Sequence, residues 1–157
     1  MAPIVPPFPA ARLRRQRSSE GLRALTRETA LSAGDLIWPV FLRDGQGLAE
    51  PVPSMPGVSR MSVDRVVEAA AEAADLGIPA ICLFPYTDPA RKTAACEEAW
   101  NPGNLSNRAI RAIKAEVPGI AVMPDIALDP YNLHGHDGIV VGGEIVHHRV
   151  PCGLGED

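Results

Sequence analysis

Apolar runs and amphipathic segments alternate along the middle of this chain, and no other feature of the sequence constrains the fold as strongly. The apolar residues of segment 63–73 recur at three- and four-residue spacing, which is typical of a helix with one buried face. Ser62 is expected to cap this helix and Gly77 to end it. Residues 78–84 follow as a continuous apolar run, as expected for a strand that is covered on both faces.

The same unit recurs further along the chain. A second amphipathic segment begins after Asn104 and leads into the apolar run 120–123. An earlier apolar run, 36–42, contains Pro39, which has no N–H, so this strand lies at an edge or has no neighbour at that position. Residues 20–29 favour a short helix, and the proline-rich segment 45–57 is expected to be a loop.

Strand, helix, strand, helix, strand is the order of a parallel sheet with right-handed crossovers, so we predict the α/β class. Three strands cannot close a barrel, and the outermost strands would leave open edges. The folded part is therefore either a small open sheet or part of something larger.

Composition narrows the class of protein. The chain has 157 residues, of which 46% are hydrophobic and 22% charged, as in an ordinary soluble domain. A net charge of -4 argues against a nucleic-acid partner, and no apolar run is long enough to span a membrane. Cys82, Cys96 and Cys152 lie far apart without metal-ligand spacing, which indicates a reduced, cytoplasmic protein. Within the run 78–84, Cys82 is expected to be a small buried hydrophobe.

The first 19 residues are rich in proline and arginine and show no core periodicity. We expect an extended arm over 1–19, a folded part over 20–146 and an atypical tail over 147–157. The arm's arginines fit a solvated tail, an arm that docks on a neighbouring subunit, or a targeting segment. Its early prolines argue against a targeting helix.

Chemically active side chains are concentrated in segment 125–138, directly after the run 120–123. They are Asp125, Asp129, His134, His136 and Asp137. This segment starts at the carboxyl end of a predicted parallel strand, where α/β proteins bind ligands. Its oxygen-rich donor set favours Mg²⁺ over Zn²⁺. The spacing fits a metal or polar substrate site, but Asp129-Pro130 and Asp137-Gly138 are also turn dipeptides, and His134 equally fits a hydrogen-bonded packing residue.

Segment 125–138 resembles the metal-site signature of the delta-aminolevulinic acid dehydratase family, whose members are also called porphobilinogen synthases. Other segments resemble further parts of that family in the same order, namely 23–29, 53–60, 76–80, 83–84, 101–102 and 108–114. The resemblance extends over about residues 12–146. It implies the first half of a (β/α)₈ TIM barrel with an extended N-terminal arm.

The resemblance also implies an activity and partners. Family members condense two molecules of 5-aminolevulinate into porphobilinogen, on the way to haem and other tetrapyrroles. Their N-terminal arm wraps a neighbouring subunit, usually in octamers, so the basic arm is expected to make a homo-oligomer.

Residue by residue, the resemblance assigns Asp125 to an active-site aspartate and Asp129 and Asp137 to metal binding. Zinc-dependent members carry three cysteines where this chain has Ala127, Asp129 and Asp137. The chain is therefore similar to the aspartate-rich branch, which is associated with Mg²⁺, and no Zn²⁺ is expected at this loop.

Two features depart from the family. The reaction needs two lysines that form Schiff bases, which the family carries in its second half. The only lysines here are Lys92, in a polar loop, and Lys114, which is expected to be a solvated cation on a helix. Residues 147–157, including His147 and His148, replace the family's next helix. We therefore expect a first half that is truncated or ends in an altered reading frame.

We expect the isolated chain to be inactive. One alternative is a non-enzymatic remnant or a half-barrel that binds other subunits. Another is a free-standing Mg²⁺-binding domain, which the open sheet edges disfavour.

Overall fold

The computed structural model describes residues 6–12 and 14–146. Contacts within the chain divide it into two units, residues 1–32 and 33–157. The boundaries expected after residues 19 and 146 stay predictions, and the tail 147–157 lies outside the described residues. No helix in the described part is both long and apolar enough to cross a membrane.

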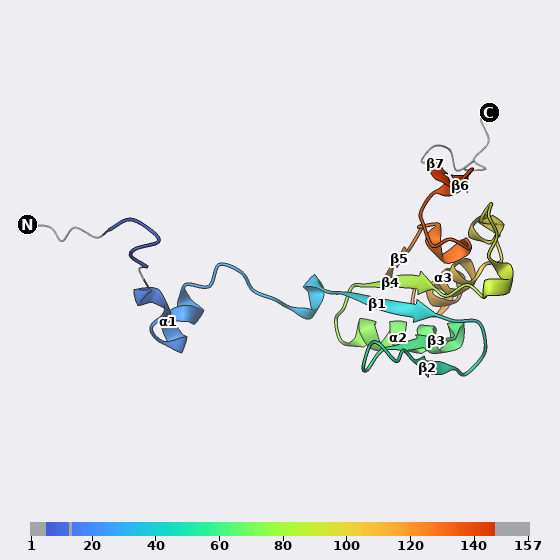
Figure 1. The fold of residues 1–157 in the computed structure, drawn as a ribbon. Coiled ribbons are helices and arrows are strands. Elements are labelled where there is room, and N and C mark those ends of the chain that lie inside the picture. The colour runs from blue at the N-terminus through green and yellow to red at the C-terminus, as the bar shows by residue number, and fades with distance from the viewer. Residues whose placement is uncertain (1–5, 13, 147–157) are drawn as a thin grey trace, which may run out of the picture. The chain divides into compact units, whose positions relative to one another are not determined.

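The first unit contains a 3-10 helix (Arg15–Arg17) and the α-helix α1 (Glu20–Leu25), drawn in blue in Figure 1. Ser19 caps α1 by accepting a hydrogen bond from the Leu22 N–H at 3.2 Å. The helix ends before residue 29, because the backbone of Thr26 is no longer helical. Neither helix buries a residue within this unit.

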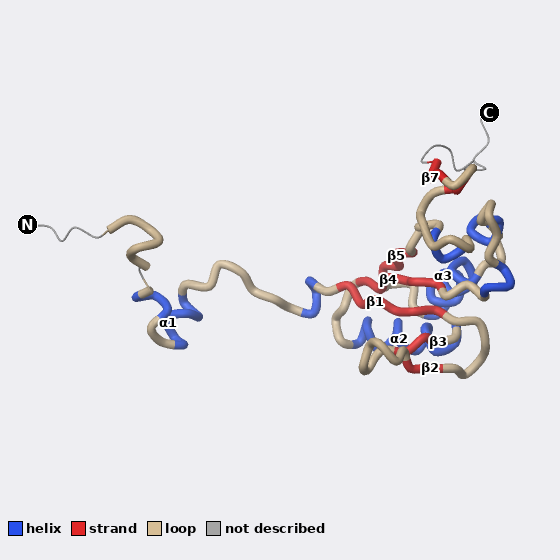
Figure 2. The backbone as a smooth tube through the Cα atoms, viewed as in Figure 1, coloured by secondary structure: helices blue, strands red, loops and turns tan. Residues whose placement is uncertain are grey.

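The second unit is built on a five-stranded sheet of order β2-β3-β1-β4-β5 (Figures 1 and 2). The strands are β1 (Ile37–Leu42), β2 (Ala49–Pro51), β3 (Ser59–Met61), β4 (Ala80–Pro85) and β5 (Ala121–Pro124). Strands β3, β1, β4 and β5 are parallel, and β2 pairs antiparallel with β3. A separate antiparallel hairpin follows, made of β6 (Ile139–Val141) and β7 (Glu144–Val146). The predicted α/β class is confirmed.

Helices α2 (Val63–Asp75) and α3 (Leu105–Glu116) cover one face of this sheet. Short 3-10 helices lie at Ala33–Asp35, Pro89–Arg91, Glu97–Trp100 and Asp129–Tyr131. Buried side chains from the strands and both helices form one core, which includes Val40, Leu42, Val66, Ala70, Ala73, Ile81, Leu83, Ala109 and Ile113. The predicted helix after Ser62 is confirmed, and Gly77 ends it with a φ of 79°. The Ser62 hydroxyl, however, accepts a hydrogen bond from the Leu48 N–H at 2.9 Å and makes no cap bond.

The opposite face of the sheet is largely uncovered. Successive residues of a strand point to opposite faces, so Ile81 and Leu83 are buried under the helices while Cys82 points the other way. Ile37 and Met123 retain 49% and 47% of their accessible surface on that face. The expectation that Cys82 is a buried hydrophobe is therefore wrong, since this side chain is only half-buried. A strand can be apolar throughout and still have one face without a covering layer in this chain.

The structure tests the loop expected over 45–57 and the place of Pro39 in its strand. Segment 45–57 is not entirely a loop, because it contains β2. Strand β1 is central, not at an edge, and Pro39 is accommodated within it. The Leu42 carbonyl points towards β4, because it accepts a hydrogen bond from the Tyr86 N–H just after that strand. Backbone polar groups of successive strand residues point to alternate sides, so the nitrogen of Pro39, three residues earlier, faces the β3 side. Because β3 pairs with β1 only from Phe41 onward, no strand lies beside Pro39 on that side.

Lys114 is exposed on α3, as expected, but its ammonium also makes specific contacts. Its ammonium donates to the carbonyls of Pro118 and Ile120 at 2.6 and 2.8 Å, and so fixes the turn between α3 and β5. Lys114→Met should lower the free energy of unfolding by about 1–3 kcal/mol, because two hydrogen bonds to a charged donor are lost. Urea denaturation measures this change, and Lys92→Met, which changes a lysine outside this turn, is the control. Equal effects of the two changes would contradict the role of Lys114.

Candidate functional site

Asp125 lies at the carboxyl end of β5, where segment 125–138 begins. Its N–H donates to the Leu83 carbonyl of β4 at 2.9 Å, which continues the parallel pairing by one residue. Its carboxylate accepts a hydrogen bond from the Ala127 N–H at 3.1 Å and turns the chain away from the sheet. The expected position of Asp125 at the end of a parallel strand is thus confirmed.

The segment then folds back on itself, so that residues nine positions apart become neighbours. Asp129 starts a 3-10 helix, Asp129–Tyr131, and the Leu128 N–H before it donates to the Asp137 carboxylate at 3.2 Å. Asn132 is buried inside this loop. We call residues 125–138 the acidic loop.

The carboxylates of the acidic loop influence one another. Partial burial, followed by the nearby charges of Asp137 and Asp125, raises the pKa of Asp129 above its ordinary value of 3.8. The three acidic side chains therefore share one electrostatic environment, where a cation would relieve their repulsion. Within the described residues, no group of three His, Cys, Asp or Glu side chains is arranged to hold a metal ion. The catalytic role of Asp125 and the metal-binding roles of Asp129 and Asp137 stay predictions.

The two histidines of the loop lie beside each other, with ring centroids 6.1 Å apart. The His134 Nδ1 accepts a hydrogen bond from the His136 N–H at 3.4 Å. The His134 Nε2 is buried and makes no hydrogen bond within the described structure. His134 thus combines the expected packing role with one nitrogen that remains unpaired.

The segment between β4 and α3 supports the acidic loop from one side. The Thr93 N–H donates to the Tyr131 carbonyl at 3.1 Å, and the Tyr131 side chain packs with Cys96 and Leu128 in a small apolar cluster. Burial raises the pKa of Tyr131, as do the charges of Asp125 and Glu98. Burial likewise raises the pKa of the Cys96 thiol, which keeps this cysteine unreactive.

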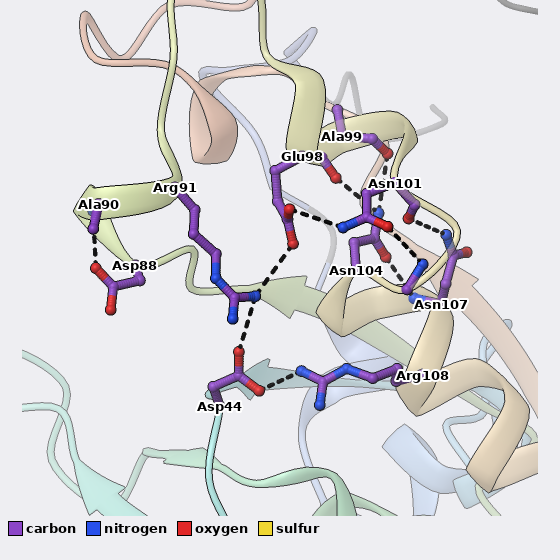
Figure 3. A network of polar contacts seen from close by, with 11 residues as sticks. Asp44, Asp88, Ala90, Arg91, Glu98, Ala99, Asn101, Asn104, Asn107 and Arg108 are labelled. Carbon is purple, nitrogen blue, oxygen red and sulfur yellow. Dashed lines mark hydrogen bonds and ion pairs between the residues drawn. The ribbon is translucent and has the colours of Figure 1, made fainter.

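A charged network holds that supporting segment against the sheet and α3 (Figure 3). Asp44, in the loop after β1, forms ion pairs with Arg91 at 3.5 Å and with Arg108 of α3. Arg91 also pairs with Glu98 at 3.5 Å, and the Asn101 side chain donates to Glu98 at 3.0 Å. No local sequence pattern links Asp44 to Arg108, 64 positions later, so this network was not predictable from the sequence. These side chains are mostly half-exposed, so their main effect is on loop geometry.

The raised pKa of Asp129 predicts a pH dependence of stability. The folded state holds the Asp129 proton more tightly than the unfolded state, so its stabilising contribution is present at low pH and is lost as the pH rises through the folded pKa. Asp129→Asn should therefore raise the free energy of unfolding of the metal-free chain at pH 7. This gain should shrink as the pH falls towards 3.8. Urea denaturation in a chelating buffer across this range tests it, and a gain confined to acidic pH would contradict the assignment.

Comparison with known proteins adds to this geometry. A sequence model of the family described as delta-aminolevulinic acid dehydratase matches residues 10–151. The chain is 50% identical over 147 residues to delta-aminolevulinic acid dehydratase of Rhodobacter capsulatus, covering 94% of this chain and 44% of the relative. It is 51% identical over 138 residues to that of Bradyrhizobium diazoefficiens, covering 88% and 39%.

A solved structure gives the same result. The fold is similar to the crystal structure of delta-aminolevulinic acid dehydratase (porphobilinogen synthase) from Toxoplasma gondii ME49 in complex with the reaction product porphobilinogen, with a TM-score of 0.80 and 41% identity. The match covers 87% of this chain and 39% of that TIM-barrel chain. The chain thus spans about two-fifths of the length of its relatives.

Proposed function

Because the chain belongs to the delta-aminolevulinic acid dehydratase family, we propose that it supplies the first part of a porphobilinogen synthase, which condenses two molecules of 5-aminolevulinate to porphobilinogen. The observation that carries this proposal is the position of the acidic loop. The acidic loop begins at the carboxyl end of β5, next to β4. It lies within residues 10–151, which match the family model. TIM-barrel enzymes place their reacting groups at this end of the strands.

In this proposal Asp125 is the catalytic residue of the chain. Its backbone is fixed by β4 and its carboxylate is oriented by the Ala127 N–H. A carboxylate held in this way is suited to bind the ammonium group of 5-aminolevulinate and to accept a proton from it. The rigid strand end keeps it in place without reorganisation during the reaction.

The covalent chemistry is assigned to residues beyond this chain. A Schiff base needs a lysine amine that is free and unprotonated. The Lys114 ammonium is occupied by two backbone carbonyls, and Lys92 belongs to the segment that supports the acidic loop. We therefore assign both Schiff-base lysines to the part of the family's length that this chain does not span.

The metal proposed for the acidic loop is Mg²⁺, bound by Asp129 and Asp137. The donor set fits a hard cation, since the loop offers carboxylate oxygens and contains no thiolate for a Zn²⁺ site. Mg²⁺ there would supply positive charge that neutralises the carboxylates and polarises a bound oxygen. The chain's own contribution is to hold Asp137 next to Asp129 through the Leu128 N–H.

The proposed protein partner is a second copy of the chain, contacted through the N-terminal arm in a homo-oligomer such as an octamer. Residues 1–32 contain six arginines and two glutamates, whereas the whole chain has a net charge of -4, so the remainder is strongly acidic. Phe8, Leu25 and Leu31 of this first unit retain 78–83% of their accessible surface. A basic arm with exposed apolar side chains fits an acidic protein surface. The free thiols of Cys82 and Cys96 fit a cytoplasmic location.

A second reading is a non-enzymatic remnant or a half-barrel that binds other subunits, which fits the engagement of Lys114 by two backbone carbonyls. The two readings differ when the chain is mixed with the separately purified remainder of the Rhodobacter capsulatus relative. We expect no porphobilinogen from the isolated chain and measurable formation after mixing. Formation by the isolated chain would contradict the assignment of the lysines, whereas a stable but inactive mixture would support the second reading.

A further inference from the structure

Asn132 is the most deeply buried polar side chain of the acidic loop, with only 1% of its surface exposed. Its amide nitrogen donates to the carbonyls of Leu128 and His136, at 3.2 and 2.5 Å. Its amide oxygen accepts a hydrogen bond from the Gly135 N–H at 2.7 Å. Both amide hydrogens are used, so the side chain has no donor left for a ligand.

These hydrogen bonds join the two ends of the loop. Leu128 precedes Asp129, and His136 precedes Asp137, so one carboxamide links the backbone positions that carry the two acidic residues. Gly135 bends the chain between them with a φ of 72°, a backbone conformation that favours glycine. The Leu128 N–H, on the same peptide segment, donates to the Asp137 carboxylate.

We propose that Asn132 is a positioning residue that sets the spacing between the carboxylates of Asp129 and Asp137. It touches neither a metal nor a substrate and acts through the loop backbone. The inference rests on the proposed function only in treating the two carboxylates as cation ligands. Outer groups that orient metal ligands typically change metal affinity by about 10- to 100-fold when removed.

Amide hydrogen exchange of the 157-residue chain tests the spacing without any metal. Asn132→Ala removes the hydrogen-bond acceptor of the Gly135 N–H. Faster exchange of the Gly135 amide is therefore expected whether or not Asn132 positions the carboxylates. The Leu128 N–H is bonded to Asp137 and not to Asn132, so it reports on the position of the carboxylate. We expect its exchange to accelerate at least about 10-fold, in line with the loss of roughly 1.4 kcal/mol of local protection.

Two further variants make the test specific. Asn132→Asp keeps the shape and the acceptor for Gly135 but, when ionised, offers no donor, so it should expose the Leu128 amide while Gly135 stays protected. Asn107→Ala removes an amide that donates to the Asn101 carbonyl at 3.2 Å, outside the acidic loop, and is the control. Protection of the α2 and α3 amides shows that each variant is folded.

Binding of Mn²⁺, used as a spectroscopic stand-in for Mg²⁺, adds a second measurement. We expect Asn132→Ala to weaken Mn²⁺ binding by about 10- to 100-fold and Asn107→Ala to leave it unchanged. Unchanged Leu128 exchange in both Asn132 variants would overturn the inference, as would equal Mn²⁺ affinity of the native chain and Asn132→Ala. If the native chain binds no Mn²⁺, the proposed metal function fails, and Leu128 exchange alone decides the inference.

Discussion

Replacing Leu83 with alanine should lower the free energy of unfolding of the chain by about 2–5 kcal/mol. Leu83 is fully buried in the centre of β4 and packs in the core that the sheet forms with α2 and α3. Its removal costs transfer free energy and leaves a cavity that the flanking strands β1 and β5 cannot fill by moving. Urea denaturation followed by circular dichroism measures the loss.

Met123→Ala is the matched control for this change. Met123 lies on the neighbouring strand β5, is 47% exposed and points to the uncovered face of the sheet. Its truncation in the isolated chain should cost less than about 1 kcal/mol, because about half of its surface stays in water and no closed cavity is left behind. Equal losses for the two changes would contradict a sheet whose core lies on one side.

Replacing Asp129 and Asp137 together with asparagine should weaken Mg²⁺ or Mn²⁺ binding by at least about 100-fold, because the two charged oxygen ligands become neutral amides. The fold should survive, since the carboxylate of Asp137 accepts one hydrogen bond, from the Leu128 N–H, that the asparagine oxygen also accepts. Calorimetric titration with Mg²⁺, or the Mn²⁺ resonance signal, measures the change.

Asp88→Asn is the control for the acidic loop. Asp88 is an exposed carboxylate in the segment after β4, where it accepts a hydrogen bond from the Ala90 N–H at 2.9 Å. Its neutralisation alters the net charge in the same direction but leaves the loop intact. If it weakened cation binding as much as the double change, the binding would reflect overall charge, and the assignment of Asp129 and Asp137 would be wrong.

Elements with a local signature were predictable from the sequence. The spacing of Val66, Ala70 and Ala73 indicated α2, and the apolar run that contains Ile81 and Leu83 indicated β4. Each pattern lies within one element, because the buried positions of a helix or strand are set by its own geometry. Strands β2 and β3 have three residues each and show no such period. They form because β2 pairs with β3 and β3 pairs with β1, which is a long-range effect.

Features that depend on neighbouring layers were not predictable. The run 78–84 indicates an apolar environment but does not tell which face is covered, and Cys82 is therefore less buried than expected. Within the acidic loop, residue types were sufficient to identify Asp125, Asp129 and Asp137 as candidates. The part played by Asn132 depends on the loop's path, because its partners are backbone groups that carry no sequence signal.

The central claim is that this chain supplies a catalytic part of a porphobilinogen synthase through Asp125. The most direct test is a chimera in which residues 10–146 replace the matching part of the Rhodobacter capsulatus relative, assayed for porphobilinogen formation from 5-aminolevulinate. We predict an active chimera whose kcat falls by at least about 100-fold in Asp125→Asn, because a neutral amide accepts no proton. A folded chimera without activity, or one in which Asp125→Asn leaves kcat unchanged, would contradict the claim.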